Sequence, residues 1–214
     1  ASAYPCYISY SDNTRFIRPT VVGGALSFTA TTNNYIEDPV YADSFNTTSS
    51  ATTPPLGAVI FGAGTVGSIL KGGNFWSGIA NVHPDTAYLY LTNAANVRWH
   101  TCGTTATPID GGSSNQMLYA CNDAGNSLNV EIKRVYFTNI ATRFISTVNS
   151  SKGLVIENCF DDYAGTNTSM DTLDTIVKGF GIAAADTAFT SVYGTIFYNI
   201  FTSATVGRVG LTFN

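Results

Sequence analysis

The chain has 214 residues, of which 44% are hydrophobic and 11% are charged, and its formal net charge is −4. This hydrophobic content predicts a folded domain with a substantial core and excludes a disordered chain. Ten scattered basic residues within an acidic balance argue against a nucleic-acid-binding surface, and no apolar run approaches the ~18 residues of a membrane helix.

The charged fraction is less than half of the usual share of about 25%. Thr, Ser, Asn and Gly fill the difference, so we expect a polar but uncharged surface that suits carbohydrate contact or tight packing in a trimer. The chain begins ASAYPCY, without an initiator Met or a signal-like apolar stretch. We therefore expect an interior or C-terminal part of a longer protein.

Six short segments repeat one pattern, in which an aliphatic or aromatic residue precedes a small core residue by three or four positions. In chain order they are RFIRPTV (15–21), YIEDPV (35–40), VRWHTC (97–102), VEIKRVYF (130–137), LVIENCF (154–160) and VYGTIFY (192–198). One alignment predicts an inward row of Ile17, Ile36, Trp99, Ile132 and Ile156, and a corner row of Val21, Val40, Cys102, Val135 and Cys159. A unit of roughly 20–25 residues built from short strands indicates a β-solenoid.

Two prolines precede the corner valines of the first two segments, Pro19 and Pro39. In this alignment the inward and corner residues of those segments are four positions apart instead of three. Because proline cannot donate to a central ladder, we expect a wider corner in these two coils.

A column of charged residues follows the inward row and should point outward, since side chains alternate across a strand. It contains Arg18, Glu37, His100, Lys133 and Glu157. Coils stack about 4.8 Å apart, so we expect Arg18 to face Glu37 and Lys133 to face Glu157. Each such pair contributes about 0.2–1 kcal/mol.

Three further segments interrupt the repeat. The polar stretches 44–57 and 103–116 predict loop insertions, which in solenoids often gather on the binding face. Residues 58–70, AVIFGAGTVGSIL, match a dinucleotide-binding fingerprint with Asp85 beyond it. However, Gly72 and Gly73 follow too soon for the required helix, so we interpret the glycines as tight turns. Residues 168–180 have a helical apolar spacing and predict a short helix or a surface insertion.

The chain has four cysteines, and none has metal-ligand spacing. Cys102 and Cys159 fall at the corner position and are interpreted as small core residues. We expect all four thiols to be reduced, as in a protein that assembles in a reducing cytoplasm. His83 and His100 have no carboxylate pair at ligand spacing, so we predict no metal and no cofactor.

Candidate site residues are sparse. Glu157, Asp161 and Asp162 flank one corner, where two carboxyls could reach the 6.5–9.5 Å separation of an inverting glycoside hydrolase. They are therefore the catalytic candidates if the chain is an enzyme. Glu37 and the glycine-flanked Trp76 are the candidates for carbohydrate binding, because an exposed aromatic ring can stack on a sugar.

With its coils aligned, the chain resembles the right-handed parallel β-helix proteins, in particular bacteriophage tailspikes and tail fibres, and more broadly the pectate-lyase-like enzymes. Segments 130–163 and 13–44 carry this resemblance, about a third of the chain. It implies a homotrimer in the virion tail, assembled in the host cytoplasm, which binds and often cleaves or deacetylates lipopolysaccharide or capsule. No catalytic motif of these proteins has a counterpart here.

We therefore expect an all-β fold, a right-handed single-stranded parallel β-helix over 1–200, with loop insertions and a C-terminal cap or trimer contact at 201–214. Two functions remain open. One is a non-enzymatic segment that attaches the virion to host polysaccharide, without nucleic acid or membrane insertion. The other is a polysaccharide depolymerase, a hydrolase or a lyase. Carboxylates converging in a groove would favour the enzyme, and charges spread as ion pairs would favour attachment. A secreted pectinase-like protein would need disulfides and a basic groove, and the sequence indicates neither.

Overall fold

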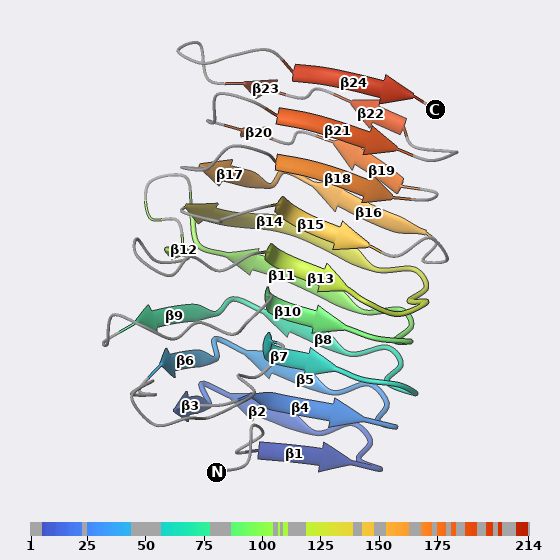
Figure 1. Cartoon of the computed structure of the whole chain (residues 1–214). Helices are drawn as coiled ribbons and strands as arrows, with labels where there is room; N and C mark the ends of the chain where they lie inside the picture. Colours follow the sequence, from blue (N-terminus) through green and yellow to red (C-terminus); the bar gives the residue numbers. More distant parts are fainter. Residues whose placement is uncertain are drawn as a thin grey trace, which may run out of the picture.

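The computed structural model describes the chain from Cys6 to Phe213, with gaps. The described residues are 6–22, 25–43, 57–77, 87–104, 107, 109–110, 119–138, 143–147, 153–162, 168–172, 175–178, 181–182, 187–191, 196–198, 201–202 and 209–213. They form 24 β-strands and no helix. Every strand pairing among them is parallel, and the strands stack coil upon coil from the N-terminal to the C-terminal end (Figure 1). The fold is a parallel β-helix, as expected from the repeat.

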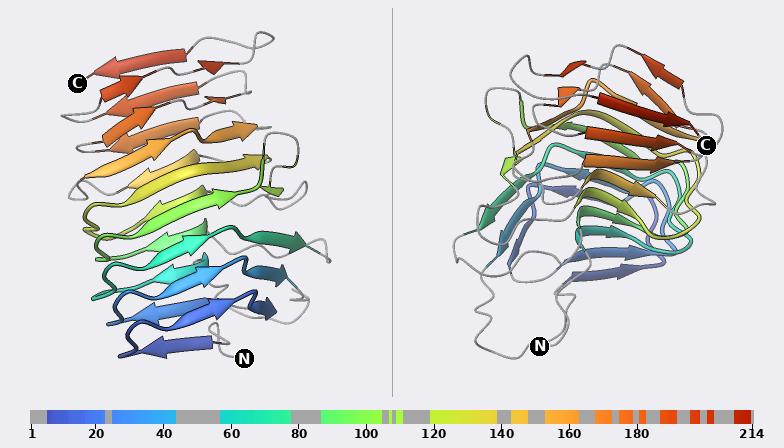
Figure 2. Two further views of the ribbon diagram at one scale, coloured as in Figure 1. Left: turned by 180° about the vertical axis from the view of Figure 1, so that it is seen from behind. Right: turned by 45° about the horizontal axis from the view of Figure 1, so that its top comes forward.

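Sheet 1 contains the first strand of each of the first six coils. Its order is β1 (Cys6–Ser9), β4 (Leu26–Thr29), β7 (Gly57–Phe61), β10 (Ala87–Leu91), β13 (Tyr119–Asp123) and β15 (Arg143–Thr147). Beyond it, β18 (Thr168–Thr172), β21 (Thr187–Ser191) and β24 (Val209–Phe213) form a separate three-stranded sheet. In Figure 2 these strands continue the stack of sheet 1.

Sheet 2 contains the second strand of each coil. Its main path is β2 (Arg15–Ile17), β5 (Tyr35–Glu37), β8 (Ile69–Lys71), β11 (Arg98–Cys102), β14 (Glu131–Thr138), β16 (Leu154–Glu157), β19 (Thr175–Lys178) and β22 (Ile196–Tyr198). Four short strands extend it around the next corner, β12 (Ile109–Asp110), β17 (Phe160–Asp162), β20 (Gly181–Ile182) and β23 (Phe201–Thr202). In the first three coils this third side is a sheet of its own, β3 (Thr20–Val22), β6 (Val40–Asp43) and β9 (Asn74–Ser77).

The core is a set of axial rows, because the same position of each coil points inward. In sheet 2 the inward row is Phe16, Ile36, Leu70, Trp99, Ile132 and Ile156, joined by strand pairing. All but the half-buried Phe16 are fully buried. Three aromatic rings pack together in the core: Trp99 stacks on Tyr88 at 5.5 Å and meets the edge of Phe137 at 5.7 Å. Burial of these rings stabilises the core.

Each coil bends sharply where its sheet 2 strand turns the corner. The bend is made by one residue in the left-handed region, with φ between 48° and 70°, at Arg18, Asp38, Gly72, Thr101, Arg134 and Asn158. A left-handed residue costs about 1–2 kcal/mol where it is not glycine, so the recurrence at one axial position shows that stacking enforces it. The next residue points inward and forms the corner row: Pro19, Pro39, Gly73, Cys102, Val135 and Cys159.

The expected register is correct for three coils and wrong for the first; in the second coil Ile36 lies in the inward row as expected, but the corner residue is wrong. Phe16, not Ile17, pairs with Ile36, and Ile17 is 52% exposed. Val21 is buried as expected, but it pairs with Tyr41, and Val40 is half-buried opposite Thr20. The prolines themselves occupy the corner row, so the six coils whose corners the structure describes have the same spacing of three and the corner is not wider. A proline fits there because the corner position lies between strands and leaves no ladder bond unmade.

The helix expected at 168–180 is also wrong, because this segment contains strands β18 and β19. The β-branched residues of this segment and its parallel pairing with the neighbouring coils favour strands over a marginal helix of this length. At residues 62–67 the fingerprint glycines form the corner between β7 and β8, with Gly64 at φ 78° and Gly67 at φ 71°. No helix starts there, so the dinucleotide interpretation is excluded.

Several other expectations lie outside the described residues. These are the insertion at 44–56, most of the insertion at 103–116, and His83. At the C-terminal end, β23 and β24 continue the parallel pairing of the preceding coils. Whether 201–214 serves as a cap or as a trimer contact stays a prediction.

Candidate functional site: a charged lateral face

Charged side chains concentrate on the outward side of sheet 2. We define the charged face as the outward positions of β2, β5, β8, β11, β14 and β16, together with the left-handed corner residue that follows each strand. One axial column contains Arg15, Tyr35, Ile69, Arg98, Glu131 and Val155, and the second contains Ile17, Glu37, Lys71, His100, Lys133 and Glu157. These columns flank the buried inward row, as the two-residue period of a strand requires.

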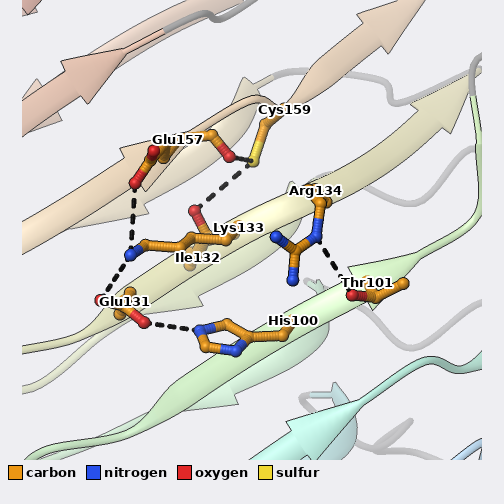
Figure 3. Close-up of polar contacts among 8 residues, drawn as sticks. All are labelled: His100, Thr101, Glu131, Ile132, Lys133, Arg134, Glu157 and Cys159. Atoms are coloured by element: carbon orange, nitrogen blue, oxygen red, sulfur yellow. Dashed lines mark hydrogen bonds and ion pairs between the residues drawn. The ribbon is translucent and has the colours of Figure 1, made fainter.

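The second column is a ladder of ion pairs along the helix axis. Lys71 Nζ lies 2.9 Å from Glu37 Oε1 on the neighbouring coil. Farther along, Lys133 Nζ lies 3.2 Å from Glu157 Oε2 and 3.0 Å from Glu131 Oε2, as Figure 3 shows. The other oxygen of Glu131 lies 2.6 Å from His100 Nε2. Each of these carboxylates therefore has a cationic or histidine partner.

The expected pair Lys133–Glu157 is confirmed, whereas the expected pair Arg18–Glu37 is wrong. Arg18 is the left-handed corner residue of its coil, one position beyond the ladder, and exposed Ile17 pairs with Glu37 instead. Lys71 provides the cation, from a coil that the sequence alignment did not include. The sequence feature that could have identified this coil is the segment Ile69-Leu70-Lys71, just before Gly72. It has the same apolar-apolar-charged order as Val155-Ile156-Glu157.

The ladder changes the proton affinities of its members. A hydrogen bond from Lys71 lowers the pKa of Glu37, and the same bond raises the pKa of Lys71. For Glu131, partial burial acts to raise the pKa, but hydrogen bonds from Lys133 and His100 outweigh it and the pKa is lowered. The hydrogen bond to Glu131 raises the pKa of Lys133. These glutamates stay ionised near neutral pH, so neither is suited to donate a proton.

The catalytic candidates do not come together as one described group. Glu157 ends β16, while Asp161 and Asp162 lie in β17, opposite Phe137 and Thr138 of β14. The two strands are separated by the corner at Asn158 and Cys159. The side chains of Asp161 and Asp162 are outside the described part, so their distance from Glu157 stays a prediction. Glu157 itself belongs to the ladder.

The carbohydrate-binding candidates lie on different sides of the helix. Glu37 is on the charged face, four coil steps from Glu157 through Lys71, His100 and Lys133, which is about 19 Å. Trp76 lies in β9 opposite Ala42, on the third side, and its side chain is outside the described part. Trp99, in contrast, is a core residue, as expected.

Three of the four cysteines are unsuited to act as nucleophiles. All four are free, and Cys102, Cys121 and Cys159 are buried. Burial raises the pKa of Cys159 to about 12 and raises the pKa of Cys102 and of Cys121 as well. Since the thiolate is the reactive form, these thiols are inert in the folded protein. Cys159 Sγ instead donates a weak hydrogen bond to the carbonyl of Ile132 at 3.6 Å (Figure 3).

The described residues bring together no three His, Cys, Asp or Glu side chains that could hold a metal ion. The described part of the chain also contains no helix that is long and apolar enough to cross a membrane. No protein-family model matches the chain, and no curated protein matches it in sequence.

Proposed function

We propose that this chain is a β-helical segment of a bacteriophage tailspike or tail fibre that attaches the virion to surface polysaccharide of the host and does not cleave it. The observation that carries the proposal is the pairing of the glutamates on the charged face. Glu37, Glu131 and Glu157 are each held by a lysine of the ladder. A general acid for glycosidic cleavage needs a proton at working pH, whereas the pairing lowers the pKa of Glu37 and of Glu131.

The architecture supports attachment in a second way. A parallel β-helix presents the same outward positions at each coil, about 4.8 Å apart. A polysaccharide also repeats along its length, so a long lateral face can contact several sugars at once. The polar, weakly charged composition is compatible with many hydrogen bonds to hydroxyl groups.

The second candidate is a depolymerase that uses Glu157, Asp161 and Asp162. Its support is their position on both sides of one corner, in β16 and β17. In this case Glu157 and Asp161 would be the acid and its partner across the corner, with Asp162 beside them.

The proposal includes a homotrimer in the virion tail, assembled in the cytoplasm of the host. Light scattering should then give about three times 22.7 kDa. A monomer would refute the trimer. Attachment without cleavage would then depend on the binding test that follows.

Binding and cleavage are tested together. The purified protein is incubated with a panel of lipopolysaccharides and capsular polysaccharides, both acidic and neutral, while binding is followed by biolayer interferometry and new reducing or unsaturated ends are measured. We expect at least one member to bind and none to gain ends. New ends would establish the depolymerase, and a panel without any binding would refute attachment.

A further inference from the structure

The basic residues of this acidic protein are unevenly distributed. Six of its ten Lys and Arg have described side chains, and all six lie on the charged face: Arg15, Arg18, Lys71, Arg98, Lys133 and Arg134. The same face carries four acidic side chains, Glu37, Asp38, Glu131 and Glu157. In contrast, the corresponding row of sheet 1 has no charged side chain among its described members, and two of these, Ser27 and Ile60, are buried. The row contains Tyr7, Ser27, Ile60, Tyr90 and Asn122. The charged face thus has a positive excess although the chain as a whole is at −4.

The excess consists of arginines. Both lysines are neutralised by ladder glutamates. Among the described residues none of the four arginines has a carboxylate within ion-pair distance, and all four are exposed. Arg15 lies 5.3 Å over the ring of Tyr35, and Arg134 Nε donates a 3.4 Å hydrogen bond to Thr101 Oγ1 (Figure 3).

The arginines occupy two places along the axis. Arg15 and Arg18 lie in the first coil, at the N-terminal end of the ladder. Arg98 lies in the fourth coil, opposite Glu131 of the fifth, and Arg134 is at the corner of that fifth coil. The first and fourth coils are about 14 Å apart along the axis. Half-buried Tyr35, Ile69 and Val155 lie in the same column as Arg15 and Arg98.

We propose that the charged face binds an anionic polysaccharide lying along the helix axis, and that the four arginines hold its carboxylate groups. This inference rests on the proposed function and names its ligand class. A guanidinium presents a planar fork of donors that fits a carboxylate with two parallel hydrogen bonds. The apolar and aromatic side chains between the arginines provide contact for sugar ring faces.

The spacing favours carboxylates over phosphates. A phosphate carries up to two charges and is commonly held by several cations that converge on it. On this face the four free cations are spread over several coils, which matches single charges spaced along a polymer. The glutamate ladder between them repels any anion that is out of register, so it contributes specificity.

The test uses the native protein and each carboxylated capsular polysaccharide of the panel in two forms, native and with its carboxyls chemically reduced to alcohols. The reduced form keeps the sugars and linkages and removes the charge. We expect the native form to bind and the reduced form to bind at least tenfold more weakly. Since each lost charged hydrogen bond corresponds to about a tenfold change in Kd, Arg98→Gln and Arg134→Gln should each weaken binding by about that factor.

Lys71→Gln combined with Glu37→Gln is the matched control, because it removes a cation of the same face together with its glutamate partner and leaves the net charge of the face unchanged. It should change Kd by less than about threefold. None of these side chains is buried, so the variants should fold normally, which circular dichroism checks. Duplex DNA is included as a polyanion without sugar carboxylates and should bind more weakly than the polysaccharide.

The outcomes separate this inference from the proposed function. Equal binding of native and reduced polysaccharide, or unchanged Kd in both arginine variants, would refute the arginine surface while attachment stands. DNA binding as tight as polysaccharide binding would refute a carboxylate-specific surface. Failure of every panel member to bind would refute both.

Discussion

Replacing Glu157 by glutamine separates a structural carboxylate from a catalytic one. Glutamine keeps the shape of the side chain and removes its negative charge. The only described partner lost is Lys133, at 3.2 Å, which keeps its 3.0 Å contact with Glu131. The two side chains are 27% and 33% exposed. For an ion pair this exposed, solvent screening limits the contribution to about 0.2–1 kcal/mol, so we expect the variant to lose less than about 1 kcal/mol of unfolding free energy.

The pair itself is measured with a double-mutant cycle. Urea unfolding is followed by far-ultraviolet circular dichroism for wild type, Glu157→Gln, Lys133→Gln and the double variant. The coupling energy should lie between about 0.2 and 1 kcal/mol. The control cycle combines Lys133→Gln with Glu37→Gln, which lies three coil steps away and pairs with Lys71, and its effects should add. Zero coupling between Glu157 and Lys133 would refute the ladder, and a loss of polysaccharide cleavage by 10²–10⁴-fold would make Glu157 catalytic.

The remaining predictions concern the core and the ionisation of the ladder. Trp99→Ala should lower the unfolding free energy by about 3–5 kcal/mol, since it empties a fully buried site between Tyr88 and Phe137; a loss below about 1.5 kcal/mol in urea unfolding would show that the ring is not in the core. The pKa values of Glu37 and Glu131 are lowered on folding from 4.5. The two carboxylates should therefore make their full contribution to the unfolding free energy above pH 4.5, and this contribution should be lost as the pH falls through their lower pKa values in the folded protein. In thermal unfolding between pH 3 and 7, this pH-dependent loss should be smaller in a Glu37→Gln/Glu131→Gln variant; an identical profile would contradict the assignment. Buried Cys102, Cys121 and Cys159 should resist a thiol reagent at pH 8 in the folded protein, and all four thiols should react in urea; fewer than four would reveal a disulfide.

The later coils could be predicted from sequence because their anchors are unambiguous. Trp99 and Ile132 are each flanked by charged or polar residues, and Ile156 is followed by Glu157, so alternation identifies the inward side chain and places the corner three positions later. In the first coil Phe16 and Ile17 are adjacent and both apolar, and the alignment followed the valines instead of the prolines. A one-residue slip reverses every side chain of a strand, which is why Arg18 was paired with Glu37.

Other parts depend on contacts between coils and have no local signal. Strands such as β7 and β10 are almost continuously apolar. They therefore lack the alternation of apolar and polar residues by which a strand is recognised in a sequence. Thirty-four positions separate Ile36 from its neighbour Leu70, and the insertion between them hid the coil that supplies Lys71. The role of Glu131, and that of the four arginines without a carboxylate partner among the described residues, follow from which coils are adjacent, and only the stacked structure specifies that.

The most direct test of attachment without cleavage is the molar mass of a bound polysaccharide over time. The panel member with the tightest binding is incubated with the protein for a day, and size-exclusion chromatography with light scattering compares it with an untreated sample. The account predicts that the polysaccharide co-elutes with the protein and, after proteolytic removal of the protein, has its original molar mass. A shortened polysaccharide would show that the face or its neighbouring corner is a depolymerase site, and would contradict the account.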